Sequence, residues 1–537
     1  MLFLTRSWFS GFAAILFAAG ALLAFAPQPA QAEMTALRQA IAEFASDDRQ
    51  LARFYRDTGF AAVWAGEGAE YQDRRRALIS ALQRAPSHGL PAGRYDIDGL
   101  IAQMRGAKTQ RDLGIVDVAL SKAYLDYARD LQSGIVKPSS IDDGIVRKVH
   151  VRDRAENMSA LVNGDPDSVM RALAPQSPEY VRLRKEMQRL QALIARGGWG
   201  ETVPGTKLEP GDSGAAVVKL RNRLVSMGYL ARSASMVYDR HIEAAVQQFQ
   251  ADHGLETDGV AGTSTLAELN APVEKRLHSV LVAMERERWL NRDRGQRHVL
   301  VNLADYTAKI IDDGKVTFVT RSVVGANKHD RRSPEFSDVM EHMIVNPTWN
   351  VPRSIAVKEY LPMLQKDPNA VSYLRLTDTR GQLVNRGEVD FTQFDTKNFP
   401  FDMKQPPSNA NALGLVKFMF PNAQNVYLHD TPAKSLFARE TRAFSHGCIR
   451  LQKPFEFAYT LLARQSDDPE DDFHRVLGTG VETQVNLQQH IPVHIIYRTA
   501  MAPAKGNVQY RRDVYGRDGR IWDALEQAGV ALGAVRG

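Results

Sequence analysis

Residues 298–325 read HVLVNLADYTAKIIDDGKVTFVTRSVVG, and they decide how the C-terminal part of the chain folds. Alternation and β-branched residues run along this stretch, as is typical of half-buried β-strands. The step Asp312-Asp313-Gly314 supplies the residue types that a tight hairpin turn requires. The stretch therefore predicts a β-hairpin, and it opens a mainly β domain that we expect over residues 297–520.

Further strand-like runs follow this hairpin, namely VMEHMIVNPTWNV, GLVKFMF, NVYLHD and IPVHIIYRTA. Residues 356–412 interrupt them with a partly helical segment and a stretch rich in Pro and Asn. An insertion of this size beside a site could act as a lid or grip a substrate. A solvated loop without a function is the alternative.

Near the start of the chain, the basic residue Arg6 is followed by an apolar run of about fifteen residues, from about Phe12 to Ala26, and by the small-residue step Ala30-Gln31-Ala32. This pattern predicts a signal peptide over residues 1–32, with an uncleaved anchor as the alternative. No later stretch approaches the roughly 18 apolar residues of a membrane-spanning helix. We therefore expect a periplasmic or otherwise extracytoplasmic protein with no transmembrane segment after cleavage.

Residues 33–198 carry apolar positions at helical spacing and predict a helical scaffold domain. Residues 205–272 predict a small three-helix module, in which two apolar faces are Val217, Leu220 and Leu224, and Ile242, Val246 and Phe249. A helical connector at 273–296 and a C-terminal tail at 521–537 complete the organisation. The expected fold class is multidomain α+β.

The formal net charge is +6, from 68 basic and 62 acidic residues, so the positive excess is spread thinly. It suits an acidic polymer, such as carboxylate-rich cell-wall material, as a partner. No basic run with interleaved aromatic residues indicates nucleic-acid binding.

The segment FSHGCIR at residues 444–450 contains the single cysteine of the chain, Cys448. One cysteine cannot form an intramolecular disulfide, so its roles are a buried structural thiol or a reactive nucleophile. A reactive thiol needs a base or a cation nearby. His429 and His446 are the candidates, with His429 as the base and His446 as an orienting or charge-supplying group.

Gly447 lacks a Cβ, so its backbone can approach a substrate closely. Its N–H group and that of Cys448 could together bind a developing oxyanion. Arg450 could bind a substrate carboxylate through two hydrogen bonds or form a structural salt bridge. A zinc site made from His429, His446 and Cys448 would consume the nucleophile, and we expect neither a metal nor a cofactor.

Two regions of the chain resemble known families. GDSGAAVVKLRNRLVSMGYL and AAVQQFQADHGLETDGVAGTSTLAELN are similar to a peptidoglycan-binding domain. NALGLVKFMFPNAQNVYLHDTPAKSLFARETRAFSHGCIRLQKP resembles the active-site region of L,D-transpeptidases with a YkuD-like catalytic domain. VNPTWNVPRSIA at residues 345–356 resembles the larger branch of that family, which also carries a scaffold domain and a peptidoglycan-binding domain.

The resemblance implies Cys448 as nucleophile, His429 as general base, His446 as second histidine, and an oxyanion hole around Gly447 and Cys448. Other residues of the matching stretches are candidate substrate-binding residues: Arg450, Ser445, Tyr427 and Trp349. The chain departs from the family at Asp430, where many members have glycine.

The activity implied by this resemblance is an acyl transfer on peptidoglycan. Cys448 would form a thioester with a tetrapeptide stem, release D-alanine and pass the acyl group to a neighbouring stem as a 3→3 crosslink. An L,D-carboxypeptidase or hydrolase acting on the same stems, and a non-catalytic wall-binding scaffold, are the alternatives. Stem peptides, glycan and other wall-synthesis proteins are the implied partners.

Overall fold

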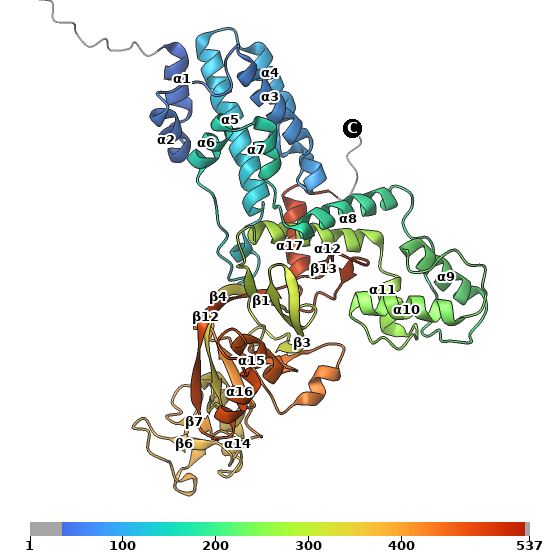
Figure 1. Ribbon diagram of the computed structural model, residues 1–537, viewed down its shortest axis with the longest axis vertical. Helices are drawn as coiled ribbons and strands as arrows, with labels where there is room; N and C mark the ends of the chain where they lie inside the picture. Colours follow the sequence, from blue (N-terminus) through green and yellow to red (C-terminus); the bar gives the residue numbers. More distant parts are fainter. Residues whose placement is uncertain (1–34, 532–537) are drawn as a thin grey trace, which may run out of the picture.

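The computed structural model describes residues 35–531, so the predicted signal peptide at residues 1–32 lies outside the described residues. Helices occupy the N-terminal half, a large β-sheet dominates the C-terminal half, and a small helical module projects to one side (Figure 1). Four separate clusters of buried apolar side chains underlie this arrangement. The fold class is thus multidomain α+β, as predicted.

The first cluster belongs mainly to the N-terminal helices. Asp48, Thr109, Asp153 and Ser177 begin four of them by accepting hydrogen bonds from backbone N–H groups of the first turn. The elements are α1 (Ala36–Phe44), α2 (Arg49–Asp57), α3 (Ala69–Gln83), η1 (Ala85–His88), η2 (Ala92–Tyr95), α4 (Ile97–Gly106), α5 (Gln110–Ser133), η3 (Pro138–Ser140), α6 (Arg154–Asn163), α7 (Pro166–Ala172) and α8 (Pro178–Ile194).

The small module contains α9 (Ala215–Met227), α10 (Arg240–His253) and α11 (Thr263–Leu269). All six apolar residues that the sequence assigns to its two helical faces are buried. The left-handed residues Gly228 and Gly254 end α9 and α10. Three helices around one compact core are what the sequence predicts for this segment.

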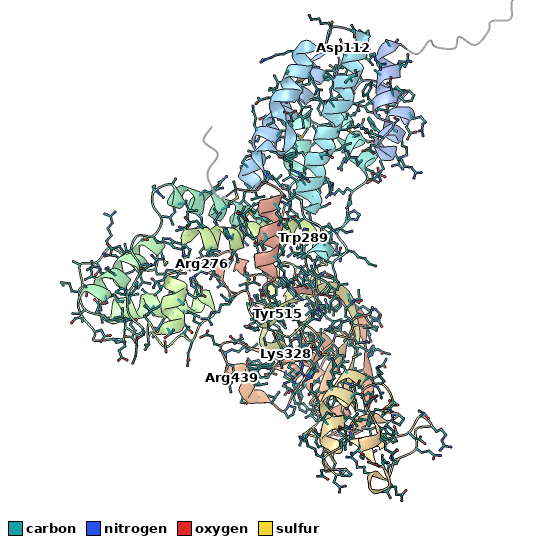
Figure 2. The ribbon with its side chains drawn as sticks, turned by 180° about the vertical axis from the view of Figure 1, so that it is seen from behind. Asp112, Arg276, Trp289, Lys328, Arg439 and Tyr515 are labelled. Carbon is teal, nitrogen blue, oxygen red and sulfur yellow. The ribbon has the colours of Figure 1, made fainter. Side chains whose placement is uncertain are left out.

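The last part of the chain returns to the N-terminal helices. Helix α12 (Val273–Trp289) packs against α5, α8, α17 (Arg517–Gln527) and the short strand β13 (Ala500–Met501), which pairs with β14 (Gln509–Tyr510). Figure 2 shows Tyr515 between Trp289, at the end of α12, and Lys328. The expected connector is therefore a buried central helix, and part of the expected tail is a packed helix.

Buried ion pairs join these parts. Arg286 of α12 contacts Asp518 at 2.8 Å and Glu335, which precedes β4, at 2.5 Å. Arg517 contacts the same Glu335 carboxylate at 3.3 Å. Unpaired buried charges are costly, so a shift of α12 or α17 away from the sheet would break these ion pairs at a high cost in free energy. The ion pairs therefore favour one arrangement of α12, α17 and the sheet.

Nine strands form the large sheet, in the order β10-β3-β11-β9-β8-β4-β12-β1-β2. Strand β2 also pairs with β3, so eight of the nine strands close into a ring. The strands are β1 (Arg297–Asn302), β2 (Thr307–Asp312), β3 (Lys315–Gly325), β4 (Phe336–Val345), β8 (Val416–Met419), β9 (Leu428–His429), β10 (Ala443–Ser445), β11 (Ile449–Leu451) and β12 (Thr483–Ile496). Helices α15 (Pro454–Leu462) and α16 (Pro469–Leu477) follow β11, and η7 (Lys434–Ala438) lies between β9 and β10.

The predicted hairpin is present as β2 and β3. Asp312 pairs with Lys315 across the turn, and both turn residues adopt positive φ angles, 49° at Asp313 and 76° at Gly314. Asp-Gly is the residue pair that favours such a turn.

The insertion has a core of its own. Its core and its sheet begin at Trp349, earlier than the predicted start at residue 356. The three-stranded sheet consists of β5 (Trp349–Asn350), β7 (Asp402–Gln405) and β6 (Arg375–Thr377), and the sequence does not predict it. Its helical elements are α13 (Arg353–Ile355), the π-helical turn η4 (Ala356–Tyr360), α14 (Leu361–Leu364), η5 (Arg386–Glu388) and η6 (Phe391–Gln393). Among the helices of residues 35–531, none combines the length and apolar character needed to cross a membrane.

Candidate active site

Strands β9 and β11 lie side by side and run parallel, with Arg450 opposite His429. Residues two apart on a strand share a face, so Tyr427 and His429 lie on the same side as Cys448 and Arg450. All four line one pocket of about 640 Å³.

The insertion also contributes to this pocket, since its residues Trp349, Arg353 and Tyr360 are among those that line it. Seven of the eight residues singled out from the sequence line the pocket: Trp349, Tyr427, His429, Ser445, His446, Cys448 and Arg450. The structure thus brings together residues from three strands of the large sheet, β9, β10 and β11, and from the insertion, which are far apart in the sequence.

His429 is almost completely buried and is held by the backbone. Its Nδ1 donates a hydrogen bond to the carbonyl oxygen of Asp430, which leaves Nε2 as the nitrogen without a proton. Burial lowers the pKa of His429 to about 3, the charge of Arg450 adds to this shift, and the carbonyls of Asp430 and Leu413 oppose it. The imidazole is therefore neutral near pH 7 and can accept a proton.

Asp430, the departure from the family pattern, is fixed by two contacts of its carboxylate. One oxygen accepts the Leu415 N–H at 3.0 Å, and the other lies 2.5 Å from the ammonium group of Lys434. Gly414 makes room for this side chain, because a Cβ there would lie 2.3 Å from Asp430 Cγ. The contacts of the Asp430 carboxylate thus hold Asp430 in place, and the carbonyl group of Asp430 orients His429.

Cys448 is half-buried, and its Sγ lies 3.6 Å from the carbonyl oxygen of Asn425. Burial raises the pKa of the thiol, while hydrogen bonding by Tyr427 and the charges of Arg450 and Lys417 lower it. The resting site therefore pairs a neutral imidazole with a protonated thiol.

The turn before Cys448 is tightly hydrogen-bonded. Gly447 has φ of 120°, its N–H donates to Ser445 Oγ at 3.2 Å, and its carbonyl accepts from Ser333 Oγ at 2.6 Å. Ser445 Oγ also donates to the Cys448 carbonyl at 2.5 Å. Gly447 is not among the residues that line the pocket, and its N–H is used within the turn. Ser445 lines the pocket, and its hydroxyl group stabilises the turn. Within residues 35–531 the Cys448 N–H has no acceptor.

Sequence reasoning missed Glu359, a residue of η4 that reaches the site. Its Oε1 lies 2.6 Å from Nε2 of His446 and 2.6 Å from a guanidinium nitrogen of Arg331. Ser333 was missed as well. No local motif marks either residue, since each acts on a partner far away in the sequence.

Arg450 has no ion-pair partner among the described residues, and its Nε is buried without a hydrogen bond. Burial lowers its pKa. Of its two predicted roles, the pocket-lining position and the missing partner favour binding of a substrate carboxylate over a structural salt bridge. In the described part of the chain, no group of three or more His, Cys, Asp or Glu residues is arranged to hold a metal ion.

Three family models match the chain. Residues 296–485 match the "L,D-transpeptidase catalytic domain", residues 49–187 match the "Scaffold domain", and residues 213–269 match the "Putative peptidoglycan binding domain". The matches confirm the resemblances drawn from the sequence.

A curated relative from Haemophilus influenzae strain Rd, named "Putative L,D-transpeptidase", is 31% identical over 237 residues. The match covers 43% of this chain and 47% of the relative, so the chain spans about half the length of that protein.

Two solved L,D-transpeptidase structures match the chain with little overall geometric agreement. An L,D-transpeptidase from Xylanimonas cellulosilytica is 14% identical, with a TM-score of 0.17 and coverage of 55% of this chain and 100% of that one. An L,D-transpeptidase from Stackebrandtia nassauensis is 15% identical, with a TM-score of 0.22 and coverage of 56% and 98%. Scores this low carry no structural argument.

Proposed function

We infer that this chain, which contains an L,D-transpeptidase catalytic domain at residues 296–485, is a peptidoglycan L,D-transpeptidase that works through a cysteine thioester. One observation supports the proposal most directly: His429, at the end of β9, and Cys448, directly before the adjacent parallel strand β11, line the same pocket. His429 is held in the tautomer that leaves Nε2 free to accept a proton.

In the first half-reaction, His429 takes the proton of the Cys448 thiol as the sulfur attacks. The attacked carbonyl belongs to the third residue of a tetrapeptide stem, just before the terminal D-alanine. A carbon–sulfur bond forms, the bond to the D-alanine nitrogen breaks, and the imidazolium returns the proton to the leaving amine. The product is a thioester.

In the second half-reaction, an amine of a neighbouring stem attacks the thioester carbonyl. His429 accepts the amine proton, the carbon–sulfur bond breaks, and the sulfur regains its proton. Because the thioester conserves the acyl bond, the resulting 3→3 crosslink needs no external energy source.

The low pKa of His429 and the raised pKa of Cys448 imply that the proton moves only when the attack occurs. The Cys448 N–H is the proposed oxyanion donor, since the Gly447 N–H is already used by Ser445. Arg450 is the proposed anchor for a stem carboxylate. His446, with Glu359 and Arg331, is proposed to orient the substrate at the rim of the pocket.

The module at residues 213–269 supports wall glycan or stem peptides as partners, and a cell-wall location outside the cytoplasm follows from them. An L,D-carboxypeptidase shares every step of the first half-reaction and uses water as the acceptor. Trp349 and Tyr360 contribute aromatic surface to the pocket lining. Because apolar surface disfavours water as the acceptor, we propose an amine acceptor.

Mass spectrometry of the purified protein mixed with a disaccharide-tetrapeptide tests the proposal. Transpeptidation predicts loss of D-alanine together with a crosslinked dimer, and both should vanish in Cys448→Ala. Tripeptide without dimer would make the protein a carboxypeptidase. No turnover by the folded, reduced wild type would reject the proposed reaction.

A further inference from the structure

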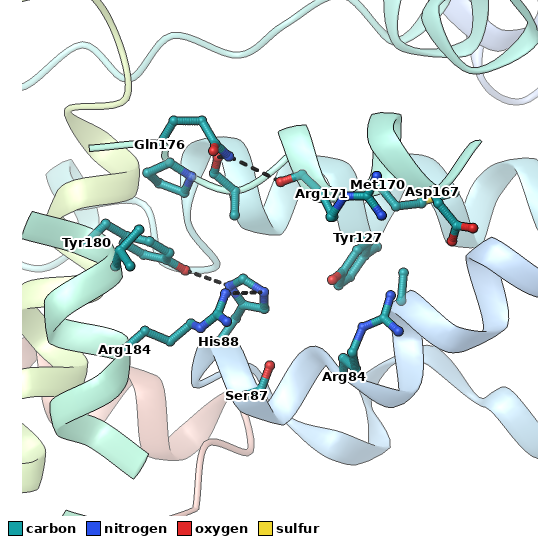
Figure 3. Close-up of a pocket in the computed structure, with 14 residues that line it drawn as sticks. Arg84, Ser87, His88, Tyr127, Asp167, Met170, Arg171, Gln176, Tyr180 and Arg184 are labelled. Atoms are coloured by element: carbon teal, nitrogen blue, oxygen red, sulfur yellow. Dashed lines mark hydrogen bonds between the residues drawn. The ribbon is translucent and has the colours of Figure 1, made fainter. Parts of the chain in front are cut away.

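A second cavity lies in the N-terminal helical region, apart from the site of Cys448. It measures about 560 Å³ and is lined by residues of α3, η1, α5, α7 and α8 and of the segments between them (Figure 3). This volume falls within the range of small-molecule sites, roughly 300–1,000 Å³.

Three arginines line this cavity: Arg84, which follows α3, Arg171 of α7 and Arg184 of α8. Among the described residues, none of the three forms an ion pair with a carboxylate; Arg84 and Arg171 donate to the hydroxyls of Ser80 and Ser168. Each guanidinium group therefore keeps its full positive charge and unused donors.

Arg184 is directed by a neutral histidine. One of its nitrogens lies 3.4 Å from Nε2 of His88, and His88 Nδ1 lies 3.2 Å from the hydroxyl of Tyr180. Because arginine can only donate, Nε2 accepts and Nδ1 carries the proton. Burial and the neighbouring arginines lower the pKa of His88 to about 3, which is consistent with this tautomer.

One carboxylate lines the cavity, that of Asp167, and it lies 3.8 Å from Arg76 on α3. The remaining walls are largely apolar or aromatic and include Tyr127, Met170 and Ala174. A single inorganic anion would fill only a small part of this space. A longer ligand with separated carboxylates would satisfy the arginines and cover the apolar walls.

We propose that this cavity binds the carboxylate-bearing end of a short acidic peptide, at a site distinct from the catalytic pocket. Guanidinium groups bind carboxylates through paired, charge-assisted hydrogen bonds. Combined with the proposed function, on which the choice of ligand rests, the peptide is a wall stem peptide held on the same enzyme molecule.

Hydrogen–deuterium exchange of the full chain tests this proposal, with Cys448→Ala so that peptide is not consumed. The probe is the tetrapeptide L-Ala-γ-D-Glu-diaminopimelate-D-Ala, compared with the same peptide amidated at its carboxylates and with inorganic phosphate. The expected result is slower exchange in residues 81–90 and 170–184 with the first probe alone. Unchanged exchange there, or equal protection by phosphate or by the amidated peptide, would overturn the proposal.

Arg84→Gln and Arg171→Gln provide the matched variants, because both side chains are exposed and their loss does not threaten the core. Each should raise the peptide concentration that gives half-maximal protection at least about tenfold, as expected for a lost hydrogen bond between charged groups. Arg105→Gln, an exposed arginine of α4 outside the cavity, should leave it unchanged. Equal binding by all variants would also reject the site. Turnover of wild-type enzyme is measured separately, so failure of this site and failure of the proposed reaction are distinguishable.

Discussion

Glu359 Oε1 lies 2.6 Å from His446 Nε2, which joins the insertion to the turn that carries Cys448. The same oxygen lies 2.6 Å from Arg331, in the loop between β3 and β4. One carboxylate thus fixes three segments around the mouth of the pocket.

Glu359→Gln should lower turnover about fivefold, since the pairs are a third exposed and worth about 1 kcal/mol. Lys358→Gln is the control, because it removes a more exposed ion pair with Asp330 from the same turn. Steady-state kinetics of both variants check this expectation. Equal rates for the two would mean that Glu359 does not position the site.

The reactivity of Cys448 should rise with pH well above the ordinary thiol pKa of about 8.5, because burial raises its pKa. Arg450 lowers that pKa, so Arg450→Gln should raise it further and slow alkylation severalfold at pH 8. Iodoacetamide modification followed by mass spectrometry measures this directly, since the chain has one cysteine. Lys453→Gln, an exposed residue, should match wild type; a faster rate in Arg450→Gln would contradict the assigned charge effect.

Gly414 and Asp430 should be energetically coupled. Gly414→Ala places a Cβ 2.3 Å from Asp430 Cγ and should destabilise the protein by about 1–3 kcal/mol. In an Asp430→Gly background the clash disappears, and only the backbone strain at φ of 62° remains, about 1 kcal/mol. A double-mutant cycle from urea denaturation measures the coupling, and strictly additive effects would refute it.

Stability should fall as the pH drops from 7 to 5. Burial lowers the pKa of His88 and of His429 to about 3, and that of His494 to about 4. Below about pH 6.5 the unfolded chain binds protons that the folded chain does not, so acid favours unfolding. His494→Gln should reduce the loss in the free energy of unfolding between pH 7 and pH 5 by about 2 kcal/mol.

Urea midpoints at pH 7 and 5 check this expectation. His241→Gln is the control, because that side chain is 68% exposed. A pH dependence that is the same in wild type and in the His494 variant would contradict it.

The sequence predicts those parts of the fold that depend on local chemistry. The hairpin turn at Asp313-Gly314 and the two faces of the small helical module are examples, because turn residues and apolar periodicity are readable from neighbours. Motif resemblance and the strand character of NVYLHD predict that His429 faces Cys448, and the structure places both residues in the lining of one pocket.

Contacts between residues that are far apart in the sequence could not be predicted. Nothing in the sequence near Glu359 indicates that it contacts His446. Nothing near Gly447 indicates that the Ser333 hydroxyl donates a hydrogen bond to the Gly447 carbonyl. Residues 521–527 were expected in a tail because their apolar positions, Ile521 and Trp522 among them, are too few to reveal a partner as distant as α12.

The location of α17 also sets an order of events during synthesis. Its buried residues belong to the same continuous core as α1 and α5, at the other end of the polypeptide. The N-terminal helices therefore lack part of their core until α17 has left the ribosome. In a chain that stops before Arg517, the side of α12 that α17 normally covers should become accessible to proteases. The closed ring of strands depends much less on α17.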